Sequence, residues 1–125
     1  MFVYIVSSEA FLLENCYKLG ITKNPRERLS TYLTGCPPHL PISADLKYLK
    51  IFKTRASCED DLRDYEEIIH NQFIYNRLFR KTFGDSEWFR LSAEEYFGFC
   101  EFITKSSWFD SEVYEEEILN INEAT

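Results

Sequence analysis

The stretch YKLGITKNPRERL, residues 17–29, decides how this chain folds. Side chains alternate along its first half, which predicts a strand over residues 16–21. Asn24 is a suitable helix N-cap, Pro25 a suitable first helical residue, and Glu27 a suitable capping-box partner. The stretch therefore predicts a strand, a turn and a helix in immediate succession.

Four basic residues gather where this strand ends and this helix begins: Lys18, Lys23, Arg26 and Arg28. Lys18 shares a strand face with Gly20, which has no side chain and so lets a backbone or an anion approach closely. A phosphate is a sensible ligand for a helix N-terminus of this charge. The alternative is a strand and helix whose charges are only solvated, and these residues alone do not separate the two.

The other segments predict a small α+β fold: a three-stranded, mainly antiparallel sheet flanked by helices, in a single domain. Strands are expected over residues 2–6, 16–21 and 46–54, and a short strand or extended segment over 87–91. Helices are expected over residues 25–34, 58–78 after a cap at Ser57, 93–105 and 113–119. The domain is expected to span residues 1–105, and residues 106–125 to form an acidic extension packed on it or trailing from it.

Composition supports a folded domain with an uneven charge. The 125 residues are 45% hydrophobic and 17% aromatic, which is ample for a core. The net charge of −7 argues against a protein that coats nucleic acid nonspecifically. Residues 1–58 hold eight Lys/Arg and four Asp/Glu, whereas residues 59–125 hold six and seventeen. The basic residues thus concentrate in the half that contains the opening stretch.

Neither a membrane segment nor a disulfide framework is expected. No apolar run approaches the ~20 residues of a membrane span. The N-terminus lacks the basic start of a secretory signal, so the protein is expected inside the cell, in the cytoplasm or nucleus. No two of the four cysteines form a CxxC pair, so neither a zinc ribbon nor a thioredoxin-type site is supported, and free thiols are expected.

The predicted helix over residues 58–78 carries one carboxylate in a distinctive place. Glu66 and His70 are four residues apart, at the edge of its apolar stripe. Glu67 points roughly 100° away from Glu66. Glu66 is therefore the acid better placed to lie half-buried and face the sheet, with Glu67 as the alternative. The helix dipole already accounts for the acidic first turn at residues 59–61.

Taken in order, these pieces resemble the GIY-YIG nuclease superfamily over roughly residues 2–91. Phe2-Val3-Tyr4 stands in place of the GIY triad, Lys18-Leu19-Gly20 in place of YIG, and Arg28 follows the glycine by eight residues. Glu66 with His70, and then Glu87-Trp88-Phe89, resemble a subgroup found in phages, large viruses and some fungi. The chain departs from the pattern at Phe2, at Lys18, and at Tyr32, where many relatives carry histidine.

The resemblance implies hydrolysis of phosphodiester bonds in nucleic acid, expected to be DNA, with Mg²⁺ or Mn²⁺ as cofactor. Its catalytic residues would be Tyr4, Lys18, Arg28 and Glu66. Glu66 would hold the metal and Arg28 would face the developing charge. Tyr4 would accept a proton, for which a phenol needs nearby cations. The residues expected to contact the nucleic acid are Tyr17, Gly20, Lys23, Arg26 and Tyr32. His70 and Glu87 would support the site from behind, and a purely structural role is favoured for His70.

Two other interpretations remain open. The chain could be a GIY-YIG-like module that binds nucleic acid or a protein without cutting, because both triads are altered and the net charge is acidic. Alternatively the site is vestigial, and the loop that holds Cys36 and His39, or the acidic tail, serves a protein partner.

Overall fold

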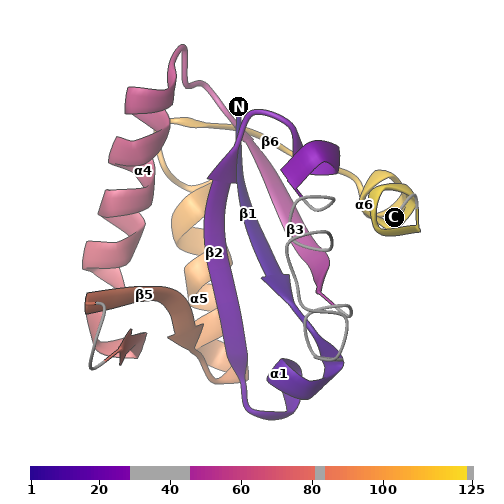
Figure 1. Ribbon diagram of the computed structural model, residues 1–125. Helices are drawn as coiled ribbons and strands as arrows, with labels where there is room; N and C mark the ends of the chain where they lie inside the picture. Colours follow the sequence, from indigo (N-terminus) through magenta and orange to yellow (C-terminus); the bar gives the residue numbers. More distant parts are fainter. Residues whose placement is uncertain (29–45, 81–83, 124–125) are drawn as a thin grey trace.

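The computed structural model describes residues 1–28, 46–80 and 84–123 (Figure 1). Within them the chain is α+β, with a six-stranded sheet in the order β4-β5-β2-β1-β3-β6 and antiparallel pairing throughout. The strands are β1 (Phe2–Ser7), β2 (Cys16–Thr22), β3 (Lys47–Thr54), β4 (Arg77–Arg80), β5 (Gly84–Arg90) and β6 (Phe109–Glu112). The helices are α1 (Glu9–Leu13), α4 (Glu59–Gln72), the 3₁₀ turn η1 (Ile74–Asn76), α5 (Ala93–Thr104) and α6 (Glu115–Glu123).

The α+β prediction is confirmed, but the predicted count of three strands was wrong. The three expected strands are β2, β1 and β3, which lie side by side at the centre of the sheet. The β4–β5 hairpin extends the sheet beside β2, and β6 extends it beside β3. β4 and β6 have only four residues each and lack a clear apolar alternation, so periodicity gave no signal for them.

Strand β1 lies between β2 and β3 and is buried on both faces of the sheet. Val3 and Ile5 face one core, which α4 and α5 complete with side chains that include Leu62, Ile69, Phe99 and Ile103. Tyr4 and Val6 face a second core, which Tyr48, Ile51, Ile118 and Ile121 complete. The sheet is therefore covered on both sides, by α4 and α5 on one and by α6 on the other (Figure 1).

Two helices begin where short-range hydrogen bonds fix them. A capping box begins α5, with Ser92 accepting from the Glu95 amide and Glu95 accepting from the Ser92 amide. The expected cap of α4 at Ser57 was wrong by one residue, since Cys58 is the N-cap. Ser57 instead donates to Asp61 from both its amide and its hydroxyl.

Two segments differ from the expected secondary structure. Helix α4 ends at Gln72 rather than near residue 78, because η1 turns the chain and Arg77 then begins β4. The segment between β1 and β2, where no helix was expected, contains α1, whose N-cap Ser8 accepts from the Phe11 amide at 3.2 Å.

Residues 106–123, which were expected to belong to an acidic extension, contribute a strand and a helix. The strand β6 pairs with β3, and Lys50 donates to Glu112 at 2.7 Å. Helix α6 then buries Ile118 and Ile121, and spans Glu115–Glu123 rather than the expected residues 113–119. In the described part of the chain, no helix is long and apolar enough to cross a membrane. Cys16, Cys58 and Cys100 are free thiols, and Cys36 lies outside the described residues.

Candidate functional site

The centre of the candidate site is Tyr4, which lies directly opposite Gly20 in the β1–β2 pair. The side chain of Tyr4 is fully buried. A Cβ atom added at Gly20 would lie 2.2 Å from both Cζ and Oη of Tyr4. Because no side chain fits there, glycine at this position lets the tyrosine ring lie flat against β2.

Arg28 reaches Tyr4 from the helical segment that follows β2. Residues 25–28 are helical, and Asn24 caps them by accepting from the amides of Arg26 (3.1 Å) and Glu27 (3.3 Å), as predicted. The Asn24 amide itself donates to Thr22 Oγ1 at 3.1 Å. Nε of Arg28 donates to Oη of Tyr4 at 3.3 Å, so a phenol and a guanidinium meet over Gly20.

Lys18 belongs to the same face of the sheet. It pairs with Val6 on β1 and with Trp88 on β5, two residues along β2 from Gly20. Diagonal neighbours in such a pair are roughly 7–8 Å apart, which places the Lys18 backbone beside Tyr4. Tyr4, Lys18 and Arg28 thus contribute a phenol and two cations to one face.

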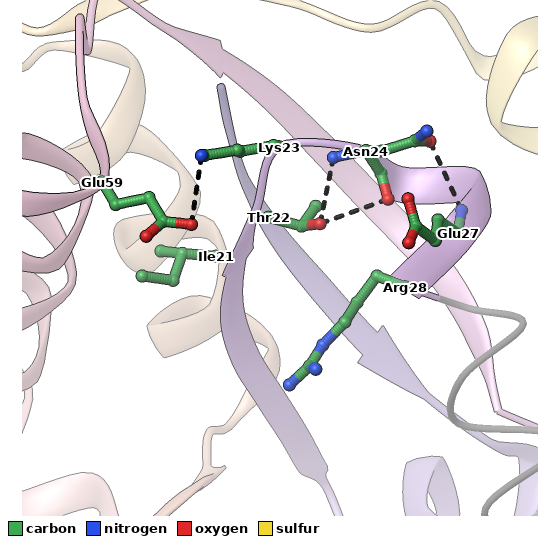
Figure 2. Close-up of a pocket in the computed structure, with 7 residues that line it drawn as sticks. All are labelled: Ile21, Thr22, Lys23, Asn24, Glu27, Arg28 and Glu59. Atoms are coloured by element: carbon green, nitrogen blue, oxygen red, sulfur yellow. Dashed lines mark hydrogen bonds and ion pairs between the residues drawn. The ribbon is translucent and has the colours of Figure 1, made fainter.

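A cavity of about 350 Å³ lies at the edge of β2 where it leaves the sheet (Figure 2). β5 pairs with β2 only at residues 16–18. Among the described residues, no strand therefore pairs with residues 19–22 on the edge of β2 that faces away from β1. The cavity is lined by Ile21, Thr22, Lys23, Asn24, Glu27, Arg28 and Glu59. In Figure 2 the Arg28 side chain extends over the sheet, away from the Lys23–Glu59 ion pair.

Glu66 lies on α4, which packs on the face of the sheet opposite to Tyr4. Its side chain is half-buried, whereas Glu67 is exposed. Its neighbours one turn away on the helix, Leu62 and His70, are buried. Glu66 therefore faces inward from α4, and it is not among the residues that line the cavity.

Two contacts fix the height of α4 along β2. Glu59 pairs with Lys23 beyond the end of β2 (3.3 Å), and the His70 ring lies 5.4 Å from Phe89, which pairs with Tyr17. The helix therefore runs antiparallel to β2 (Figure 1). Glu66 is seven residues beyond Glu59, or about 10 Å along the helix axis. The same distance along β2 is about three residues, which puts Glu66 level with Gly20.

Other predicted site residues take no part in the Tyr4–Arg28 contact. Tyr17 points to the opposite face, where it stacks on Tyr96 with ring centroids 4.6 Å apart. Burial raises the pKa of the Tyr17 phenol, and Cys100 adds to the shift. Lys23 and Arg26 are exposed, and His70 is buried against Phe89.

For two further predicted residues the structure gives no side-chain geometry. Tyr32 lies outside the described residues, and Glu87 is placed only as part of β5. Cys36 and His39 also lie outside them. The structure thus brings together Tyr4, Gly20, Arg28 and Lys18 on one face of the sheet, whereas Glu66 lies on α4 at the opposite face.

Sequence reasoning missed the residues that support this site. Tyr48 packs edge-on against Tyr4, with centroids 5.2 Å apart, and its hydroxyl donates to the Pro25 carbonyl at 2.7 Å. Glu59 lines the cavity, although its position in the first helical turn had a sufficient explanation in the dipole. Strict alternation along β3 would put Tyr48 on the same face as Phe52, which lies in the other core, but a register shift between Lys50 and Tyr48 turns Tyr48 to the Tyr4 face. Nothing in the sequence signals this shift or the contact with Pro25.

For the divalent cation that the resemblance implies, Glu66 is the candidate ligand. Across residues 1–28, 46–80 and 84–123, no group of three or more His, Cys, Asp or Glu gathers to hold a metal. A half-buried Glu66 nevertheless suits Mg²⁺, which takes oxygen ligands, keeps several waters and is often held by one or two carboxylates. The residues present therefore fit such an ion.

Comparisons with known proteins support the family assignment. The T5orf172 domain matches residues 1–104, which is most of the chain. Neither a curated protein nor a solved structure shows a significant match. The matched domain has a nuclease-like fold related to GIY-YIG and is consistent with a nuclease-type or nucleic-acid-binding module. The chain therefore belongs to the T5orf172 domain family.

Proposed function

We propose that this protein is a metal-dependent endonuclease that hydrolyses phosphodiester bonds of nucleic acid, with DNA as the expected substrate. The observation that carries the proposal is the hydrogen bond from Arg28 to Tyr4 over Gly20. A tyrosine that only fills a core needs no arginine bonded to its hydroxyl, and a strand that only packs would accept alanine in place of glycine. Here a glycine, a phenol and an arginine from separate elements meet at one point, beside a basic strand residue.

Each residue has a chemical role in this proposal. Tyr4, whose hydroxyl accepts a hydrogen bond from Arg28, would accept the proton of the attacking water. The forked donors of Arg28 would also face the charge that develops on the phosphoryl oxygens, with Lys18 as a second cation. Lys23 and Arg26 are exposed beyond the strand end and would contact flanking phosphates.

Glu66 would hold Mg²⁺ or Mn²⁺. When bound, such an ion supplies charge stabilisation at a phosphate oxygen and at the leaving oxygen. Two observations support this role: the inward orientation of Glu66 and its height opposite Gly20. The carboxylate would reach the Tyr4 face around the edge of β2 that no described strand covers. Glu67, on the exposed side of the same helix, has no such path.

The test is cleavage of supercoiled plasmid and of single-stranded DNA by the purified protein with MgCl₂ or MnCl₂, and with EDTA as the metal-free control. Glu66→Gln removes a metal-binding charge, and Glu67→Gln makes the same change one residue away on the exposed side. We expect Glu66→Gln to lower the cleavage rate by about 100-fold or more and Glu67→Gln to leave it unchanged. Equal rates for the two variants would contradict the role of Glu66.

A catalytically weak module that binds nucleic acid or a protein is the second candidate. It is favoured by Phe2 and Lys18, which replace residues of the two triads, and by the Asn24 side chain, which already bonds the first helical amides. Salt-dependent binding of DNA by wild-type protein, with no cleavage in either metal, would support this candidate over the nuclease.

A further inference from the structure

The C-terminal helix α6 packs on the face of the sheet that carries Tyr4. It lies beyond residues 1–104, which the family match covers. Ile118 and Ile121 of α6 are buried in the same core as Tyr4 and Tyr48. Figure 1 shows α6 on the far side of the sheet from α4. The helix is therefore part of the packing around the candidate site.

One polar residue of α6, Asn122, makes two hydrogen bonds to the backbone of β3. Its Oδ1 accepts from the Tyr48 amide at 2.9 Å, and its Nδ2 donates to the Tyr48 carbonyl at 3.1 Å. In the described part of the chain β6 pairs with β3 only at residues 52–54. The Asn122 amide therefore supplies at Tyr48 the pair of hydrogen bonds that a neighbouring strand would otherwise make.

Tyr48 carries this constraint to the site in two directions. Its ring packs edge-on against the Tyr4 ring, at 5.2 Å and 75°. Its hydroxyl donates to the carbonyl of Pro25, the first residue of the helical segment that bears Arg28. Arg28 in turn donates to the hydroxyl of Tyr4. Together with the two hydrogen bonds of Asn122, these three contacts connect α6, through Tyr48 of β3, to Tyr4 and to the helical segment that bears Arg28.

We propose that Asn122 and Tyr48 are positioning residues that hold the Tyr4–Arg28 pair, so that α6 is a working part of the site. The catalytic consequence rests on the nuclease function proposed above, but the structural claim does not. Loss of one neutral hydrogen bond weakens a local structure by about 1 kcal/mol, which corresponds to about fivefold more frequent opening.

The first test measures hydrogen exchange by NMR in the full chain. The probes are the side-chain Nε–H of Arg28 and the backbone amides of residues 26–28. The variants are Tyr48→Phe and Asn122→Ala. Tyr114→Phe makes the same change at a tyrosine that is 82% exposed, and Asn120→Ala makes it at an exposed residue of α6. We expect about fivefold faster exchange of these protons in Tyr48→Phe, which loses one hydrogen bond, and at least as large an increase in Asn122→Ala, which loses two. The controls should show no change.

The second test measures cleavage kinetics with the same four proteins. We expect kcat to fall by up to about fivefold in Tyr48→Phe and Asn122→Ala and to stay at the wild-type value in the controls. KM should be unchanged, since neither residue is placed to touch nucleic acid. Exchange rates equal to those of the controls, with the fold intact, would overturn the proposal. If the variants exchange faster but the wild-type protein does not cleave nucleic acid, the positioning role is supported and the nuclease function is refuted.

Discussion

Replacement of Gly20 by alanine tests the central contact of the site. Elsewhere in a strand, alanine in place of glycine should stabilise a protein, since glycine loses more conformational freedom on folding. At Gly20 the new methyl group would lie 2.2 Å from Cζ and Oη of Tyr4 and 2.6 Å from Cε1. Contacts under 3.0 Å are essentially absent around real Cβ atoms, so the ring or the strand must move.

The cost follows from how firmly the ring is held. Tyr4 is fully buried, lies on the central strand, and packs against Tyr48. Overpacking of a filled core typically costs 1–3 kcal/mol, and here the displaced group is a ring rather than a flexible chain end. We therefore expect Gly20→Ala to lower the free energy of unfolding by about 3 kcal/mol. The displaced ring would also lose the hydrogen bond from Arg28, so cleavage should fall even in the fraction that folds.

The assay is urea unfolding followed by circular dichroism. Gly98→Ala is the matched control, because Gly98 lies inside α5 and a Cβ there meets nothing within 4 Å. We expect Gly98→Ala to raise the free energy of unfolding by up to about 1 kcal/mol, because alanine has a higher helix propensity than glycine. The two glycine substitutions should therefore change stability in opposite directions.

The same substitution in a Tyr4→Leu variant shows whether the cost comes from a clash with the Tyr4 ring or from any side chain at this position of β2. Tyr4→Leu keeps an apolar side chain but removes the ring atoms that the methyl group would meet. In the Tyr4→Leu variant, Gly20→Ala should lower the free energy of unfolding only slightly, so the effects of the two substitutions are strongly coupled. If Gly20→Ala is as stable as the wild type, or costs the same with leucine at position 4, the explanation of this glycine is refuted.

Three further predictions follow from other contacts. Arg28→Lys keeps the charge but loses the Nε donor to Tyr4, so the cleavage rate should fall about 100-fold while salt-dependent DNA binding changes little; parallel losses of both would contradict this. The Ser92 amide, then the side chains of Asn76 and Ser92, lower the pKa of Glu95 below 4.5. Its stabilisation is therefore present above pH 4.5 and lost as the pH falls through the lowered value, and the stability difference between wild type and Glu95→Gln should shrink there in urea titrations. Trp108 is 8% exposed and stacks on Tyr65 at 4.7 Å and 9°, so Trp108→Ala should cost about 3–5 kcal/mol in the same unfolding assay, and a loss under 1 kcal/mol would show that the site relaxes.

The parts of the structure that could be predicted depend on short-range patterns. Alternation located β1, β2 and β3, and the cap at Asn24 located the helical segment that bears Arg28. Helical periodicity distinguished the half-buried Glu66 from the exposed Glu67. These features are determined within one element or one turn, where the spacing of residues fixes which face each side chain takes.

The remaining parts depend on partners that are distant along the chain. β6 forms because β3 offers an unpaired edge, and its own four residues, FDSE, carry little strand signal. Tyr48 meets Pro25 and Asn122 only because sheet and helix pack in this order, and 74 residues separate Tyr48 from Asn122. Periodicity also could not predict which face of the sheet α4 covers. The apolar stripe of a helix shows which of its residues are buried, but not which side of a sheet they pack against.

The cross-strand pair of Lys18 with Trp88 gives the protein an intrinsic optical probe. The chain has two tryptophans, and Trp108 is enclosed in the opposite core, where it should emit steadily. Trp88 is half-buried beside the cation that we place near the scissile phosphate. A nucleic acid that reaches Lys18 should therefore change the fluorescence of Trp88 without any label, and Trp88→Phe should abolish the signal while Trp108 remains as the reference.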